Sequence, residues 1–145
     1  MDKEAIRAKR KARRIALQAL YQWQMSASDL YEIEAQYRLS NDMQKIDIEY
    51  FSRLLHRIPS ELSEIDALFE PYLDRTIKEL NPIELAVLRL GTFELYHCLE
   101  IPYKVVLDES VLLTKTFGAQ DGYKYVNGVL NQVARKTREA EINRE

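Results

Sequence analysis

The chain has 145 residues, 46% of them hydrophobic and 30% charged, which is ordinary for one globular domain and excludes a disordered or collagen-like chain. No run of 18 apolar residues occurs, so neither a membrane span nor a membrane partner is expected. The lone cysteine, Cys98, excludes an internal disulfide and fits a reducing compartment, and we therefore expect a cytoplasmic protein.

Positive charge is concentrated at the N-terminus. Seven of the 21 lysine and arginine residues fall in the first 14 positions, where Asp2 and Glu4 leave a net charge of +5. The whole chain carries −2, so the remaining 131 residues carry −7. This asymmetry predicts an anionic partner for the N-terminus, with nucleic acid ahead of a membrane. Residues 1–14 lack the apolar segment of a secretory signal, and the two acids count against an organellar transit peptide.

The first helix is expected from about residue 4 to residue 25. At about 100° per residue, its apolar face begins at Ala12 and ends at Trp23, and Lys9 and Arg13 interrupt that face. We therefore expect residues 1–14 to project beyond the packed body and to fray until an anion binds. The opposite face carries the basic and polar residues Lys3, Arg7, Arg10, Lys11, Arg14 and Gln18.

Capping residues and prolines mark the next helices. Ser28 or Asp29 can cap a second helix that runs to about residue 39, and Asp47 opens a third. Pro59 ends the third helix, lies in the first turn of a next helix that runs to residue 70, or kinks one continuous helix over both. These alternatives stay open on the sequence alone.

The clearest helix start is Asn81, followed by proline and then Glu84, which can return a hydrogen bond as in a capping box. A further helix over 104–116 should end at Gly118, and Asp121 should cap a last helix over 122–139. Residues 138–145 are charged and are expected to fray. Scarce glycine and proline favour helices throughout, so we predict an all-α fold with about seven helices in one domain over 1–145.

No group of residues indicates catalysis. His97 and Cys98 are adjacent on a helix, so their side chains diverge and cannot chelate one ion. With His56 as the one other histidine, a zinc site is not expected, and Cys98 is interpreted as a buried thiol. Acidic residues such as Glu61 and Glu64 are interpreted as solvated surface. We therefore predict no catalytic residue, no metal and no cofactor.

The turn over 118–124 superficially resembles a phosphate-binding loop, but its spacing is wrong and it follows a helix. Lys124, Tyr125 and Asn127 nevertheless begin a helix whose N-terminal amides favour anions. An unpaired base could stack on the ring of Tyr125. The residues alone leave open whether Tyr125 is instead a core residue and Lys124 merely solvated.

Several segments, in consistent order from Arg10 to Lys136, resemble transcription antitermination factors of the NusB type. They are RKARRIALQALYQWQ (10–24), PIELAVLRL (82–90), EL (94–95), IPYKV (101–105), FGA (117–119), Asp121 and KYVNGVL (124–130). The resemblance implies seven helices in two packed bundles that form one compact domain, and it implies no enzymatic activity.

The resemblance also implies partners. They are the single-stranded boxA element of ribosomal RNA leader transcripts, ribosomal protein S10 and the RNA polymerase antitermination complex. Glu84, and less directly Tyr21, are carried over to the S10-facing side. The candidate RNA-binding residues, from the basic face and the resemblance together, are Lys3, Arg7, Arg10, Lys11, Arg13, Arg14, Gln18, Asp121, Lys124, Tyr125 and Asn127.

Four residues depart from the family pattern, at positions that bear on partner affinity and RNA preference rather than on the fold: Leu85, Asp108, Leu112 and Thr114. Two other functions are compatible with the sequence. One is a protein-only helical adapter, and the other is an RNA-binding subunit for ribosomal RNA modification, because some ribosomal RNA methyltransferases carry a similar helical part. A helical face open to S10 could also form a homodimer.

Overall fold

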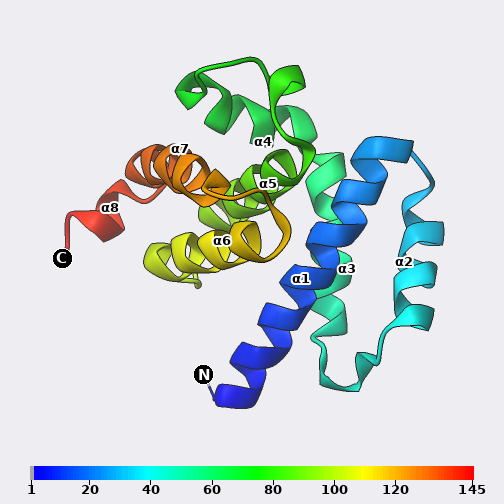
Figure 1. Ribbon diagram of the computed structural model, residues 1–145. Coiled ribbons are helices and arrows are strands. Elements are labelled where there is room, and N and C mark those ends of the chain that lie inside the picture. Colours follow the sequence, from blue (N-terminus) through cyan, green and yellow to red (C-terminus); the bar gives the residue numbers. More distant parts are fainter. Residues whose placement is uncertain (1) are drawn as a thin grey trace. The chain divides into compact units, whose positions relative to one another are not determined.

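The structure is a computed structural model that describes residues 2–145 (Figure 1). Its contacts divide the chain into two compact units, one ending at Ser60 and one beginning at Glu61. Eight α-helices and three short 3-10 turns occur between residues 2 and 145, and no strand does, which confirms the all-α prediction. Among these described helices, none is both long and apolar enough to cross a membrane.

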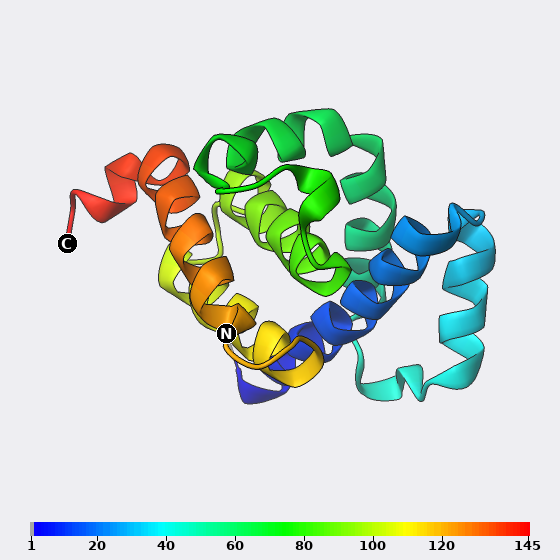
Figure 2. The ribbon, with the colours of Figure 1, turned by 45° about the horizontal axis from the view of Figure 1, so that its top comes forward.

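The first unit consists of three helices that pack on one another (Figure 2): α1 (Lys3–Ser26), α2 (Leu30–Ser40) and α3 (Ile48–Ser60), with the 3-10 turn η1 (Met43–Lys45) before α3. The carboxylate of Asp2 accepts the Ala5 N–H at 2.7 Å and caps α1. Asp29, rather than Ser28, caps α2, because its carboxylate accepts the Tyr31 N–H at 2.8 Å. Helix α3 ends one residue after Pro59, so this proline precedes a helix end rather than a kink in a longer helix.

The core of the first unit begins at Ala12, as the helical phase predicted. Residues 2–7 are all exposed, whereas Ala12, Ile15 and Ala16 are buried. Burial of each large apolar side chain contributes about 1.5–3 kcal/mol. The other buried apolar residues of this unit are Leu17, Ala19, Leu20, Ile33, Tyr50, Phe51, Leu54, Leu55 and Ile58.

The second unit is built around α5 (Pro82–His97), whose residues from Ala86 to Leu95 are all buried. The other elements of the unit are α4 (Leu62–Phe69), η2 (Glu70–Tyr72), η3 (Ile77–Glu79), α6 (Tyr103–Phe117), α7 (Gly122–Thr137) and α8 (Glu139–Ile142). Helices α4, α6 and α7 all pack against α5. A Cβ on Gly91 would lie 2.8 Å from Leu130 Cδ1 and 2.9 Å from Ser110 Oγ, so a larger residue would require these side chains of α7 and α6 to move.

The predicted N-cap of α5 is confirmed, but two details of the predicted helix ends are wrong. Asn81 accepts the N–H groups of Ile83 and Glu84 at 2.8 and 3.3 Å. The capping box is wrong, because the Glu84 side chain does not return to Asn81 and lies against Gly122. Asp121 does not cap α7 with its side chain either, since its backbone is left-handed at φ 68°.

Gly118 ends α6 as predicted, although for a different reason from the left-handed cap that glycine usually supplies. Its backbone is extended, with φ −94° and ψ 180°. A Cβ at this position would lie 2.8 Å from the Thr114 carbonyl oxygen, to which the Gly118 N–H donates at 2.8 Å. Close approach, and not backbone handedness, therefore requires glycine here.

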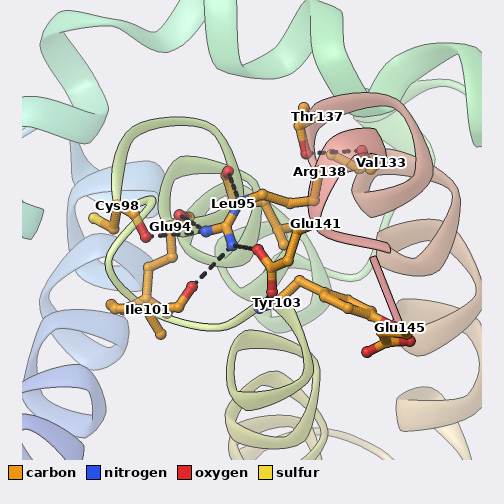
Figure 3. A network of polar contacts seen from close by, with 10 residues as sticks. All are labelled: Glu94, Leu95, Cys98, Ile101, Tyr103, Val133, Thr137, Arg138, Glu141 and Glu145. Atoms are coloured by element: carbon orange, nitrogen blue, oxygen red, sulfur yellow. Dashed lines mark hydrogen bonds and ion pairs between the residues drawn. The ribbon is translucent and has the colours of Figure 1, made fainter. Parts of the chain in front are cut away.

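The expectation that residues 138–145 fray is wrong, because Arg138 anchors them (Figure 3). Its side chain is buried, and its guanidinium donates to the last carbonyls of α5 and to the turn after it. The acceptors are the backbone oxygens of Leu95 (2.7 Å), Cys98 (2.9 Å), Ile101 (2.9 Å) and Glu94 (3.1 Å). A cation at this helix end satisfies carbonyls that have no partner within the helix and complements the helix dipole.

Helix α8, which the sequence did not predict, continues from this anchor. Glu141 Oε1 accepts from Arg138 Nη1 at 2.7 Å, and Glu141 Oε2 accepts the Tyr103 N–H at 2.9 Å. At the chain end, Glu145 accepts the Tyr103 hydroxyl at 2.9 Å and pairs with Lys104 at 3.0 Å. The C-terminal residues therefore cover the start of α6 (Figure 3).

Candidate nucleic-acid interface

The basic face of α1 is exposed along its whole length in the first unit. Lys3, Arg7, Arg10, Lys11, Arg14 and Gln18 are all exposed. The helical phase therefore placed these six side chains correctly.

A hollow of about 520 Å³ lies beside this face and is lined by Arg7, Lys11 and Lys45 of η1, together with the acids Asp2 and Glu4. The backbone N–H of Asp47 donates to the Ala8 carbonyl at 3.2 Å and ties the end of η1 to α1. Lys45, which the sequence did not single out, thus extends the positive surface of α1.

Arg13 lies apart from the other predicted contacts, because it is only 3% exposed. Its guanidinium carbon lies 5.7 Å from the ring centre of Tyr50, and Lys9 Nζ lies 4.7 Å from the same centre. Tyr50 thus explains how two cations are accommodated on the packed face of α1. The predicted RNA contact of Arg13 stays a prediction, and its burial weighs against it.

In the second unit, the turn before α7 presents a group of charged side chains. Asp121 and Lys124 are exposed, and Asp121 Oδ1 lies 3.6 Å from Lys124 Nζ. Lys115 of α6 adds a second cation, with its Nζ 4.5 Å from the ring centre of Tyr123. The turn therefore presents two cations and one carboxylate, and the Asp121 side chain does not cap α7.

Tyr125 is half-buried. It is therefore neither a core residue nor a fully exposed stacking surface, which were the two alternatives that the sequence left open. Its hydroxyl accepts the Asp74 N–H at 3.4 Å, and the guanidinium carbon of Arg75 lies 4.7 Å from its ring centre. Burial raises the pKa of the Tyr125 hydroxyl, so it stays protonated at neutral pH. The ring thus already carries one planar cation and could exchange it for a base.

Arg75 was not among the predicted site residues, although it holds the charge beside Tyr125. Its Nε and Nη2 donate to the two carboxylate oxygens of Asp74 at 2.7 and 3.1 Å. These hydrogen bonds lower the pKa of Asp74 to about 2, and the same contact raises the pKa of Arg75. No spacing in the sequence connects position 75 with position 125, so sequence reasoning had no signal for this contact.

Glu84 lies next to the same group of residues. A Cβ on Gly122 would lie 2.8 Å from Glu84 Oε2, which places the carboxylate at the N-terminus of α7. Burial raises the pKa of Glu84, and the charge of Arg75 opposes this shift. In this unit the predicted protein-contact residue therefore borders the predicted RNA-contact residues.

The two remaining predicted residues are half-buried: Asn127 lies in the first turns of α7, and Tyr21 belongs to α1 in the first unit. The basic face and Tyr21 thus lie in one unit, and the residues from Asp121 to Asn127 lie with Glu84 in the other.

Comparison with known proteins identifies the family. The sequence model of the NusB family matches residues 10–135. The chain belongs to the NusB family. This match contains every segment on which the resemblance rested, from Arg10 to Leu130, and it confirms the prediction of a NusB-type factor.

Individual relatives agree with the family match. The transcription antitermination protein NusB of Legionella pneumophila (strain Corby) is 62% identical over 143 residues, which cover 99% of this chain and 97% of the relative. A solved T. maritima NusB is 30% identical, with a TM-score of 0.78, and the match covers 90% of this chain and 96% of that one. The helical fold is therefore the fold of the NusB family.

A second solved structure contains partners. It is a crystal structure of the antitermination factors NusB and NusE in complex with dsRNA. Its matched chain is 26% identical to this one, with a TM-score of 0.78, and the match covers 88% of this chain and 96% of that chain. A member of this fold thus assembles with a protein and an RNA.

Proposed function

We propose that this protein binds the boxA element of ribosomal RNA leader transcripts together with ribosomal protein S10, and that the complex acts on elongating RNA polymerase to suppress termination. The exposed basic face of α1 carries the proposal, in a chain whose relatives are transcription antitermination proteins. NusE, the protein in the related complex, corresponds to S10.

The RNA backbone is held by the exposed cations of α1. Lys3, Arg7, Arg10, Lys11 and Arg14 lie along one face, so a strand that follows this face has five phosphates neutralised. Each phosphate contact with a single strand contributes about −0.7 to the slope of log K against log salt concentration, which gives about −3.5 for five. Backbone contacts fix position and affinity but carry no sequence information.

Bases are read around Tyr125. An unpaired base stacks on its ring, either on the face away from Arg75 or in place of the Arg75 guanidinium. Lys124 and Asp121 supply a cation and an acceptor beside the ring, and Asn127 adds an amide on the same helix. This arrangement favours single-stranded RNA, whose bases are free to stack, over a duplex.

S10 is recognised by the acidic body of the protein. The residues after position 14 carry −7, and Glu84 is a carboxylate at the N-terminus of α7 that a basic protein can neutralise. Tyr21 is a second candidate contact, and it lies in the unit that carries the basic face. The protein then acts as an adapter with no catalytic residue or cofactor, in the bacterial cytoplasm.

The test measures binding of boxA RNA, scrambled RNA and a boxA duplex, each with and without S10, over a range of salt concentrations. We expect preference for single-stranded boxA, tighter binding with S10, and a salt slope near −3.5. The variant Arg135→Ala, which removes an exposed arginine of α7 outside the predicted RNA contacts, is the matched control for Arg10→Ala and Arg14→Ala. Equal binding of boxA and scrambled RNA in the presence of S10, or a slope near zero, would contradict the proposal. Methyl transfer by the purified protein would favour the modification role.

A further inference from the structure

His97 occupies an unusual position at the last turn of α5. Its ring packs between Phe93, at a centroid distance of 5.1 Å, and Tyr96, edge-on at 4.7 Å. The side chain is 20% exposed, and its Nε2 atom has no contact with solvent. The ring is thus held in one orientation by neighbours on its own helix, with Nε2 directed inward.

Two carboxylates face this nitrogen from the start of α4. Glu61 Oε1 lies 2.9 Å from His97 Nε2, and Glu64 Oε1 lies 3.7 Å from it. Glu61 and Glu64 are three residues apart, so they share one side of the first turn of α4. One ligand atom from each of the three residues lies within 4.8 Å of the other two.

The arrangement is not that of a hydrogen-bonded histidine. Although Glu61 Oε1 lies 2.9 Å away, His97 Nε2 is buried and makes no hydrogen bond of acceptable geometry. The other histidine offers a comparison: His56 Nε2 makes an aligned hydrogen bond of 2.6 Å with Glu34 Oε1. His56 is thus hydrogen-bonded to one carboxylate, whereas His97 Nε2 lies near two carboxylates and is hydrogen-bonded to neither.

The two distances to His97 Nε2 are close to those between neighbouring ligands of a metal ion. In a tetrahedral zinc site with bonds of about 2.0–2.1 Å, neighbouring ligand atoms lie about 3.3–3.4 Å apart. The separations of 2.9 and 3.7 Å lie on either side of this value, and both change with small rotations of the Glu side chains. One imidazole and two carboxylates are ligands that Zn²⁺ and its neighbours accept.

We propose that Glu61, Glu64 and His97 bind one divalent transition-metal ion of the Zn²⁺ class, with a water molecule in the remaining position. The ion neutralises two carboxylates and joins the first turn of α4 to the last turn of α5, so its role is to stabilise the second unit. Sequence spacing does not reveal this site, because residues 61 and 64 lie more than 30 positions before His97 and on a different helix. The site is independent of the proposed RNA-binding function.

The test uses the full-length protein after treatment with a chelator and dialysis. Calorimetric titration with Zn²⁺ should give one site per chain, Co²⁺ should develop the visible absorption of a tetrahedral complex, and saturating Zn²⁺ should raise Tm. His97→Ala and Glu64→Gln should abolish the Co²⁺ spectrum and weaken Zn²⁺ binding by at least about tenfold. Because the Glu64 side chain is half-exposed, Glu64→Gln is expected to keep the fold. It therefore tests whether metal binding depends on the proposed ligands even if His97→Ala does not fold.

The matched control is His56→Ala, which removes a histidine that pairs with a single glutamate in the first unit. This variant should bind Zn²⁺ as tightly as the unmodified protein and with the same stoichiometry. Absence of saturable binding to the unmodified protein overturns the proposal. So does unchanged binding by Glu64→Gln and His97→Ala, or a loss confined to His56→Ala.

Discussion

Replacement of Arg138 by alanine should be among the most destabilising single changes in the second unit. The buried guanidinium donates to four backbone carbonyls and to Glu141 at 2.7–3.1 Å. The carbonyls of Glu94 and Cys98 also accept backbone N–H groups, from Cys98 at 3.0 Å and Ile101 at 2.9 Å. The carbonyls of Leu95 and Ile101 depend on Arg138, and alanine would leave both without it.

The size of the effect follows from these two acceptors. A buried acceptor that loses its partner costs about 1–3 kcal/mol, so two give about 2–6 kcal/mol. We expect the free energy of unfolding to fall by about 4 kcal/mol and Tm to fall by about 10–15 °C for a chain of this length.

Urea unfolding followed by circular dichroism measures this change, and the midpoint should fall while the slope stays constant. Arg135→Ala is the matched control, because Arg135 is an exposed arginine in the last turn of α7, just before Arg138, and its loss should change stability by at most about 0.5 kcal/mol. Arg138→Lys should lie between the two, since lysine keeps the charge but lacks the planar fork. A loss below about 1 kcal/mol for Arg138→Ala would refute the reasoning that it anchors α5.

Three further predictions concern the candidate interface. Replacing Arg10 and Arg14 together by alanine should reduce the salt slope of RNA binding from about −3.5 to about −2.1 without a change in Tm, and an unchanged slope would exclude them as phosphate contacts. Tyr125→Ala should reduce discrimination between boxA and scrambled RNA more than it alters the slope, whereas Tyr125→Phe should retain discrimination; the reverse order would argue against stacking. Asp74 has a folded pKa of about 2 against 3.8 for the free side chain. Its pairing with Arg75 therefore stabilises the protein above about pH 4 and is lost as the pH falls through 2, which a carboxyl titration by NMR measures; a midpoint near 4 would contradict it.

The fold was largely predictable because helix signals in this chain are local. Ala12 marks the start of the core, Asn81 caps α5 and Gly118 ends α6, and each is recognised within one or two turns of sequence. Helix α8 was missed because its stability comes from Arg138, whose acceptors lie about 40 residues earlier in the chain. A charged C-terminal segment is predicted to fray when the residues that bind it lie far away along the chain.

In the candidate site, too, features that depend on one helix were predictable and contacts between helices were not. Helical periodicity placed the exposed cations of α1 correctly, because exposure on a single helix depends on phase alone. It could not show that Tyr50 takes up Lys9 and Arg13, since that contact is made by another helix. Helical periodicity therefore predicts which residues of a helix are exposed and which are buried. It does not predict which residue of another helix a buried cation contacts, because that depends on how the helices pack.

The contacts around Arg75 change how the two proposed partners relate in the second unit. Arg75 is paired with Asp74 and lies over the ring of Tyr125, and its charge also acts on the half-buried carboxyl of Glu84. A basic protein that neutralises Glu84 removes an attraction on Arg75, while a base that stacks on Tyr125 competes with the same guanidinium. Each partner therefore alters the electrostatic environment of the other, and any resulting change in affinity must be equal in both directions. The salt and sequence dependence of RNA binding, measured with and without S10, reports this coupling directly.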